Sequence, residues 1–164
     1  MLFRSKKLYV DLVDNKDLYR ITEVYNSSKK FLISHTNYDS VRNEWIYEEI
    51  ESMKKIGFHC CKIVEISSQK LIGIMDFKID KETYLSLLII HNDYKNKGFG
   101  KEIFHALEIY AKSLRSDSIR IDVVTNYDNY VLDFWTKIGF IKIKDIELKW
   151  AGKTLCGDMM KKIL

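Results

Sequence analysis

The sequence contains no proline, and only 7 of its 164 residues are glycine. Its turns must therefore be made mainly by Asn, Asp, Ser and these few glycines. Three cysteines do not form a disulfide framework, because their number is odd and two of them, Cys60 and Cys61, are adjacent. We expect the adjacent pair to be two strand residues that point to opposite faces of a sheet.

No apolar run approaches the roughly 18 residues that a membrane-spanning helix needs. The segment Met1–Lys7 is too short and too charged for a secretory signal. The net charge of +4 is mild and dispersed, which argues against a nucleic-acid binder. We therefore expect a cytoplasmic protein that binds neither membrane nor nucleic acid. Its length and its 46% hydrophobic content fit one globular domain over residues 1–164.

Apolar residues at helical spacing predict four helices. The first follows a cap at Asp14-Asn15 and includes Leu18 to Tyr25, and the polar residues Ser34–Asn37 separate it from the second. The other three predicted helices span about Ser40–Lys55, Phe99–Leu114 and Asn129–Ile138.

Seven segments are typical of strands, and the segment Thr83–Ile90 is nearly continuous in apolar residues, which places it in the centre of a sheet. Short turns make most neighbours antiparallel, whereas the helix after residue 98 is a crossover that makes Thr83–Ile90 parallel to Ile119–Thr125. The other predicted strands are Lys7–Leu12, Phe58–Ile66, Leu71–Ile79, Phe140–Trp150 and Thr154–Lys162.

The segment Asp93–Lys101 combines three lysines with two glycines that are spaced by one residue. Glycine lets a backbone turn tightly and lets a ligand approach it closely. The free N–H groups of a turn and of the first helical turn attract an anion. The segment therefore predicts a phosphate or pyrophosphate site.

Two common phosphate-binding motifs do not fit this segment. A P-loop requires Ser or Thr after Gly-Lys, but Glu102 follows Gly100-Lys101. A dinucleotide-binding fingerprint requires a third glycine where Ile103 stands, and it belongs near the first strand of its domain rather than in mid-chain.

The stretch Lys95–Gly100 resembles the coenzyme-A pyrophosphate loop of the GNAT superfamily of N-acetyltransferases, which reads [QR]-x-x-G-x-[GA]. Further along the chain, Asn129, an apolar helix with Trp135, and then Gly139-Phe140 match a second stretch of the family. The order of predicted elements also resembles the family from about Leu8 to the C-terminus. The three similarities together are specific, whereas a G-x-G pattern alone is not.

The resemblance implies an α/β, single-domain acyl-CoA N-acyltransferase (GNAT) fold with a central mixed, mostly antiparallel sheet flanked by helices. In such a fold the parallel strand pair is splayed, and acetyl-CoA enters between the two strands as co-substrate, with no metal. The residues that the resemblance assigns to coenzyme A are Leu88, Ile89, Ile90, His91, Lys95, Asn96, Lys97, Gly98, Phe99, Gly100, Lys101, Asn126, Asn129 and Trp135.

Three positions depart from the family pattern. Lys95 stands where Gln or Arg is usual, so that the charge remains but the planar guanidinium does not. Asn92 stands where proline is frequent. Trp135 stands where a tyrosine often acts as general acid, and an indole N–H cannot donate a proton near neutral pH. Tyr130 is our candidate for that acid, with Tyr127 as the alternative.

An attacking ammonium must lose a proton, but the central strand carries no carboxylate between residues 84 and 90. His91 at the end of this strand and Glu82 at its start are the candidate general bases. Asp76 on the neighbouring strand and a water chain to backbone carbonyls stay open as alternatives.

The helical N-terminal part is expected to bind the acceptor, since the sheet half binds the cofactor. An ordinary core stripe and a solvated helix face would explain the same residues. The candidates are Tyr25, Phe31, Trp45 and Tyr47 for an aromatic lid, and Glu44, Glu48, Glu49 and Glu51 for an acidic cluster.

We therefore expect an acyltransferase that moves an acetyl group from acetyl-CoA to a primary amine of a small molecule or peptide by direct attack. A catalytically silent CoA-binding sensor or scaffold of the same fold stays open, as does a basic module that binds nucleic acid through Lys95, Lys97 and Lys101. Family members are often dimers, so a homodimer is also open.

Overall fold

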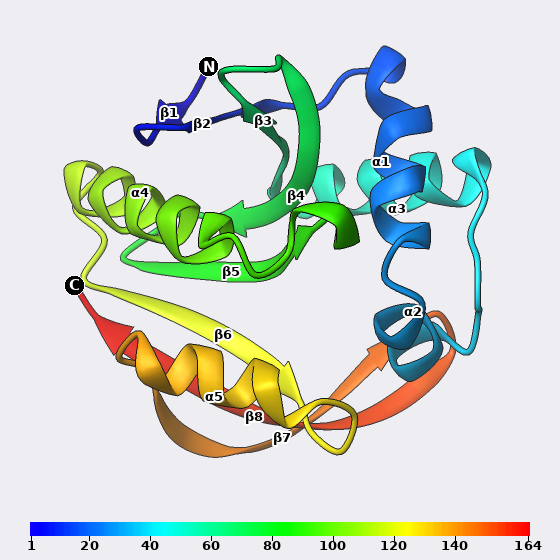
Figure 1. The fold of residues 1–164 in the computed structure, drawn as a ribbon. Helices are drawn as coiled ribbons and strands as arrows, with labels where there is room; N and C mark the ends of the chain where they lie inside the picture. Colours follow the sequence, from blue (N-terminus) through cyan, green and yellow to red (C-terminus); the bar gives the residue numbers. More distant parts are fainter.

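The computed structural model describes all 164 residues and contains one mixed sheet of eight strands (Figure 1). The strands lie in the order β1-β2-β3-β4-β5-β6-β8-β7. Their bounds are β1 Phe3–Arg4, β2 Leu8–Leu12, β3 His59–Glu65, β4 Lys70–Lys78, β5 Glu82–Ile90, β6 Ser118–Val124, β7 Ile141–Trp150 and β8 Lys153–Ile163.

Five α-helices flank the sheet, and two short 3-10 helices precede α1 and α4. Their bounds are η1 Asn15–Asp17, α1 Leu18–Asn26, α2 Lys29–Thr36, α3 Asn43–Lys55, η2 Asn92–Tyr94, α4 Phe99–Ser113 and α5 Asn129–Lys137.

The helices divide between the two faces of the sheet, and each face has its own hydrophobic core. Helices α4 and α5 contribute Phe104 and Trp135 to the core on one face. Helices α1, α2 and α3 contribute Ile21, Leu32 and Ile46 to the core on the other face. Figure 1 shows the same division, with α1 to α3 gathered on the side of the molecule away from α4.

The α/β architecture expected from the sequence is confirmed. Strands β5 and β6 are the one parallel pair, joined by the crossover helix α4, and every other neighbouring pair is antiparallel. Cys60 and Cys61 on β3 point to opposite faces, because one belongs to each hydrophobic core. Burial raises the pKa of both thiols well above the usual value, so both stay protonated.

Helix α2 was not expected, since the sequence around Ser34–Asn37 is typical of a turn. The second half of this helix, residues 33 to 36, has poor helix propensity, and the hydroxyls of Ser34 and Thr36 donate to the carbonyls of residues 30 and 32. Burial of Leu32, His35 and Thr36 against the rest of the protein stabilises the helix instead. Asn37 then ends it in a left-handed conformation with φ 67°. The short strand β1 was also missed.

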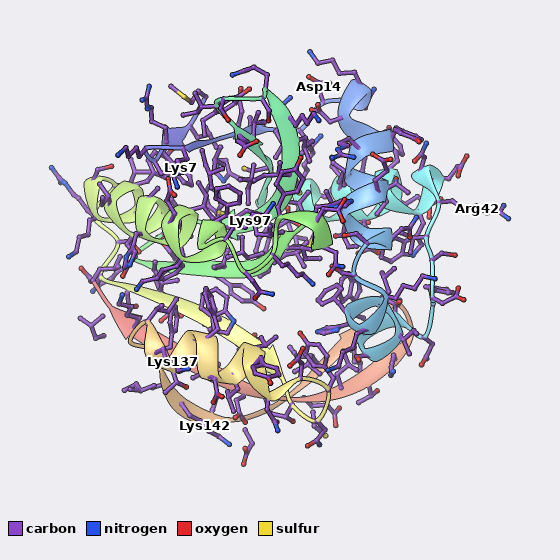
Figure 2. The ribbon with its side chains drawn as sticks, in the orientation of Figure 1. Lys7, Asp14, Arg42, Lys97, Lys137 and Lys142 are labelled. Carbon is purple, nitrogen blue, oxygen red and sulfur yellow. The ribbon has the colours of Figure 1, made fainter.

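Charged side chains lie mainly at the periphery. Figure 2 shows Asp14, Arg42, Lys137 and Lys142 pointing outward, whereas Lys97 lies at the N-terminal end of α4. No helix is both long enough and apolar enough to cross a bilayer.

Gly73 is required where β4 and β5 approach closely. A Cβ atom at this position would lie 2.6 Å from the backbone oxygen of Ile89 and 2.9 Å from Cδ1 of Ile90. We expect Gly73→Ala to lower the free energy of unfolding by about 1–3 kcal/mol, because the strands must move apart. Urea denaturation measures this change. Gly100→Ala is the control, since its Cβ would meet only Phe134 at 3.7 Å. Equal stability of the two variants would contradict the prediction.

Candidate active site

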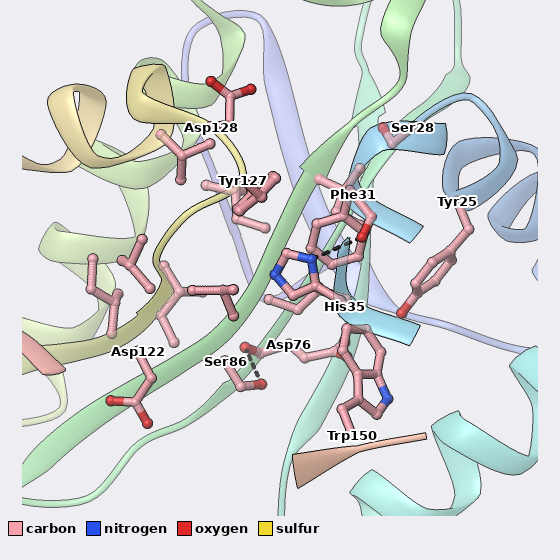
Figure 3. Close-up of a pocket in the computed structure, with 18 of the residues that line it drawn as sticks. Tyr25, Ser28, Phe31, His35, Asp76, Ser86, Asp122, Tyr127, Asp128 and Trp150 are labelled. Carbon is pink, nitrogen blue, oxygen red and sulfur yellow. Dashed lines mark hydrogen bonds between the residues drawn. The ribbon is translucent and has the colours of Figure 1, made fainter. Parts of the chain in front are cut away.

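A cavity of about 800 Å³ opens where the parallel strands part. Strands β5 and β6 pair only at Glu82↔Ser118, Thr83↔Ile119 and Tyr84↔Arg120, although both strands continue beyond these residues. The diverging strands line one side of the cavity, and residues of α1, α2, α3 and β7 line the other (Figure 3). Beyond Tyr84, β5 has no strand partner on its β6 side.

A β-bulge in β5 coincides with the divergence. Asp76 of β4 pairs with Leu87, while the next residue, Phe77, pairs with Leu85. Ser86 is therefore the extra residue, and its hydroxyl donates to the backbone oxygen of Asp76 at 3.2 Å. The sequence predicted a strand buried on both faces, but residues 86 to 88 are only half-buried because they line the cavity.

The glycine-rich turn follows β5 and the short helix η2. Asn96 and Gly98 have left-handed backbones with φ of 59° and 81°. The N–H groups of residues 96 to 101 donate to no acceptor within the protein, and the first hydrogen bond of α4 runs from the N–H of Glu102 to the carbonyl of Gly98 at 3.0 Å. A Cβ atom on Gly98 would meet no atom within 4 Å, so the space beside these amides is open.

Several lysines surround this turn and the adjacent end of the cavity. Lys29, Lys30 and Lys95 line the cavity. The ammonium of Lys95 lies 3.4 Å from the hydroxyl of Ser28, and burial there lowers its pKa. Lys97 lies over the ring of Tyr94, 5.2 Å from its centroid. The turn thus combines free amides with positive charge, which suits an anion.

Asp76 is a candidate proton acceptor in the cavity wall. Burial raises the pKa of its carboxyl from 3.8 to about 7, and the nearby Glu49 adds to the rise. A carboxyl with such a pKa can gain and lose a proton near neutral pH, as a general base requires.

Tyr127 is a candidate proton donor. It follows β6 and lines the cavity opposite β5. Burial raises the pKa of its hydroxyl to about 12, so the hydroxyl stays protonated at neutral pH. Its ring packs edge-on against His35, with ring centroids 4.8 Å apart.

An aromatic wall, formed by Tyr25, Phe31, His35, Tyr127 and Trp150, lines the cavity opposite the strands (Figure 3). Phe31 and His35 stack with their centroids 4.0 Å apart, and Trp150 packs edge-on against both. The Nδ1 atom of His35 lies 2.8 Å from the carbonyl of Phe31, and the Nε1–H of Trp150 donates to Glu49 at 2.8 Å.

The model of the acetyltransferase (GNAT) domain matches residues 24–161, which is 138 of the 164 residues. This chain belongs to the GNAT acetyltransferase family. The resemblance inferred from the sequence is thereby confirmed, and the protein is an acyltransferase by family. No curated protein matches the sequence.

Solved structures share the GNAT fold at low sequence identity. An acetyltransferase from Thermus thermophilus has a TM-score of 0.76 and 20% identity, with 96% of this chain and 97% of that chain covered. A spermidine N-acetyltransferase from Vibrio cholerae, in complex with CoA and spermine, has a TM-score of 0.72 and 14% identity, covering 96% and 95%. A Salmonella typhimurium structure with its cofactor acetyl-CoA has a TM-score of 0.66 and 16% identity, covering 96% and 94%.

The structure brings together only some of the residues that the resemblance assigned to coenzyme A. Leu88, Ile89, Ile90, Lys95 and Trp135 line the cavity of this GNAT protein. The turn residues Asn96, Lys97 and Gly98 precede α4, and Phe99, Gly100 and Lys101 begin it. None of these six residues lines the cavity, and neither do His91, Asn126 and Asn129.

Trp135 is both a core residue and part of the cavity wall. It packs against Phe104, Phe134 and Phe140, with ring centroids 5.5, 5.0 and 5.3 Å away. Only 8% of its surface is exposed. This packing explains why an indole is accommodated where many family members carry a tyrosine.

None of the three side chains predicted to be catalytic lines the cavity. The Nδ1 atom of His91 accepts a hydrogen bond from the N–H of Asp93 at 3.2 Å and so caps η2. Glu82 forms an ion pair with Lys161 at the opposite end of β5. Tyr130 is 84% exposed on the outer side of α5. Asp76 and Tyr127, which the sequence left as alternatives, occupy the cavity instead.

Only some of the residues predicted to bind the acceptor line the cavity. Tyr25, Phe31 and Glu49 line the cavity, and Trp45 lies behind Tyr25 and Trp150, with centroids 6.0 and 6.1 Å away. The residues that do not line it are Tyr47, Glu44, Glu48 and Glu51.

Sequence reasoning missed His35 and Trp150. His35 lies on the helix that was interpreted as a turn, and Trp150 ends a strand next to a turn. Only the placement of α2 against the end of β7 brings these two rings together. A histidine among apolar residues was the one local signal available.

Burial lowers the pKa of His35 from 6.5 to about 4. The unfolded chain therefore binds this proton more readily, and stability is lost as the pH falls from about 6.5 to about 4. The expected loss at pH 5 relative to pH 7 is about 2 kcal/mol. Protonation of Asp76 stabilises the folded protein as the pH falls, which opposes the effect of His35. Urea denaturation should therefore compare the loss of stability from pH 7 to pH 5 in the wild type with that in His35→Gln. An NMR titration of the imidazole with a midpoint near 6.5 would refute the assignment.

Proposed function

We propose that this GNAT protein transfers an acetyl group from acetyl-CoA to a primary amine of a small molecule or peptide, as a single domain over residues 1–164. The observation that carries the proposal is the cavity between β5 and β6, which begins beside a turn with six free backbone N–H groups. A diphosphate fits the turn, and an extended thioester fits the unpaired side of β5.

The N–H groups of residues 96 to 101 would hold the pyrophosphate of the co-substrate, with Lys95 and Lys97 supplying positive charge. The backbone of Leu88–Ile90 would pair with the pantetheine arm like an added strand. In the neighbour from Salmonella typhimurium acetyl-CoA is the bound cofactor, which supports the same co-substrate here.

In the proposed reaction, Asp76 accepts one proton and Tyr127 donates another. The carboxylate of Asp76 takes a proton from the acceptor ammonium, and the free amine nitrogen attacks the thioester carbon. Backbone N–H donors of β5 stabilise the tetrahedral oxyanion, each contributing roughly 3–4 kcal/mol. As the carbon–sulfur bond breaks, the hydroxyl of Tyr127 donates a proton to the departing thiolate, and the phenolate regains a proton from the positively charged nitrogen of the intermediate. The products are the N-acetylated amine and free CoA.

The glycine-rich turn can be tested with two matched variants. Gly98 and Gly152 both have positive φ, 81° and 74°, and an added Cβ would meet no atom within 4 Å at either site. We expect each Gly→Ala variant to lose about 1 kcal/mol of stability to backbone strain. Only Gly98→Ala should also weaken acetyl-CoA binding, by about 10-fold or more, because its methyl group occupies the anion site.

Thermal-shift titrations with acetyl-CoA measure both effects. Wild type and Gly152→Ala should be stabilised by about 2.7 kcal/mol at 100 times the dissociation constant. Equal affinities of the two variants for acetyl-CoA would overturn the assignment of the turn. The absence of any shift in the wild type would overturn the proposed function.

Asp76→Asn tests the general base. We expect kcat to fall by about 10²- to 10⁴-fold while the affinity for acetyl-CoA is unchanged. The rate of the wild type should rise as the pH is raised to about 7, because Asp76 loses its proton over this range. This rise of the rate with pH should be absent in Asp76→Asn. Thiol release, followed across pH 5 to 9, measures both. Asp80→Asn, an exposed carboxyl in the next turn, is the control. A variant within 3-fold of wild type would exclude Asp76 as base.

A further inference from the structure

Two carboxylates line the acceptor half of the cavity, which is the part bounded by the aromatic wall, α3 and β4. Asp76 comes from β4, and Glu49 comes from α3. Asp76 pairs in register with Cys60 of β3, and the Sγ atom of Cys60 lies 3.8 Å from the carbonyl oxygen of Ile50, the residue after Glu49. The two carboxylates therefore belong to one region of the cavity wall.

The hydroxyl of Tyr25 is influenced by both carboxylates. Burial raises the pKa of this hydroxyl well above its usual value, and the negative charges of Asp76 and Glu49 raise it further. Figure 3 shows Tyr25, Asp76 and Trp150 directed into the same part of the cavity. A ligand that fills this part therefore meets both negative charges.

Neither carboxylate has a cationic partner within the protein. Asp76 accepts hydrogen bonds from the thiol of Cys60 and the N–H of Cys61, which are neutral groups. Glu49, which is half-buried, accepts from the neutral indole N–H of Trp150 at 2.8 Å. Neither residue belongs to an ion pair. A carboxylate that is partly removed from water is costly without a counter-charge, so this region favours a cationic ligand.

The other two carboxylates that line the cavity already have cationic partners. Asp122 accepts from the guanidinium of Arg120 at 2.8 Å. Asp128 lies 3.5 Å from the ammonium of Lys30. The uncompensated negative charge of the cavity is therefore confined to Asp76 and Glu49.

The lysines that line the cavity do not supply the missing counter-charge. Lys149 alternates along β7 with Leu148 and Trp150, which face the cavity, so its exposed side chain points toward the other face of the sheet. The other three lie at the end of the cavity next to the glycine-rich turn, and they are Lys29, Lys30 and Lys95. The cavity thus has a positive end for the co-substrate and a negative region in its acceptor half.

A neutral group of the aromatic wall also favours a ligand that donates hydrogen bonds. The Nδ1 atom of His35 lies 2.8 Å from the carbonyl of Phe31, which can only accept, so Nδ1 carries the proton. Nε2 is then an acceptor that faces the cavity (Figure 3), and burial lowers the pKa of the imidazole to about 4, which keeps it neutral. An ammonium group, which has N–H donors and no acceptor, matches these surroundings.

We infer that the acceptor carries two cationic groups: the reacting amine, which faces Asp76, and a second ammonium, which binds to Glu49. This inference rests on the proposed function and specifies its substrate class. Asp76 removes a proton from the reacting amine, so that Asp76 and this amine are both neutral before the attack. The charge of Glu49 then remains, and only a second cation balances it. Glu49 is therefore the residue that determines the choice of acceptor.

Three amines of equal chain length separate the effect of charge from that of size and hydrogen bonding. n-Butylamine, 4-amino-1-butanol and 1,4-diaminobutane end in a methyl, a hydroxyl and an ammonium group, respectively. We expect kcat/KM at pH 7 to be about 10-fold or more higher for 1,4-diaminobutane than for the other two. The corresponding amines with three and five carbons are measured as well, because the spacing of the two ammonium groups must match that of the carboxylates.

Glu49→Gln removes the charge of Glu49 but keeps an oxygen that can accept from the indole N–H of Trp150. We expect the preference for the diamine over the monoamine to fall toward one in this variant. Glu48→Gln is the matched control, since Glu48 is the preceding residue of α3, is exposed and does not line the cavity. It should keep the preference of the wild type. Dissociation constants, from quenching of tryptophan fluorescence at saturating CoA, should follow kcat/KM in all three proteins.

The outcomes distinguish this inference from the proposed function. If no diamine exceeds its matched monoamine and amino alcohol, the inference is overturned, whereas thiol release with any of these amines leaves acetyl transfer established. A diamine preference that survives in Glu49→Gln would also overturn the inference. Tighter binding of a diamine that is lost in Glu49→Gln, without thiol release from acetyl-CoA, would support the dication site and overturn the transfer reaction.

Discussion

The early end of pairing between β5 and β6 is the constraint on which the site depends. Both strands stay fixed on their other sides, because β4 pairs with β5 as far as Ile90 and β8 pairs with β6 as far as Val124. Each strand therefore keeps one partner while the gap between them opens. Backbone groups on the facing edges need hydrogen-bond partners, and an extended ligand can supply them without any movement of the sheet.

Helix α2 closes the other side of this gap through contacts with three distant segments. Ser28, which precedes the helix, lies 3.4 Å from the ammonium of Lys95. Lys30 lies near Asp128 at the start of α5, and Lys153 donates to the carbonyl of Ile33 at 3.1 Å. The acceptor half thus depends on tertiary contacts around one short helix, whereas the cofactor half depends on the sheet and on one local turn.

This difference explains which parts of the site could be predicted from the sequence. The turn at Gly98 is a local feature, since its glycines and lysines are adjacent in the chain, and the crossover after β5 follows from the order of elements. The direction in which His91 and Glu82 point could not be inferred, because capping of η2 and an ion pair with Lys161 hold them outside the cavity. The wall around Trp150 depends on α2, whose second half, residues 33 to 36, has little helix propensity.

Burial in the same apolar cavity sets the protonation state of three groups at once. It raises the pKa of Asp76 to about 7 and that of Tyr127 to about 12, and it lowers that of His35 to about 4. In a wetter cavity, the pKa of Asp76 would fall toward 3.8 and the carboxylate would be a weaker base. The apolar lining of the cavity is therefore also what makes Asp76 basic enough to deprotonate an amine. A substitution that lets water into this cavity would weaken the base as well as change the acceptor site.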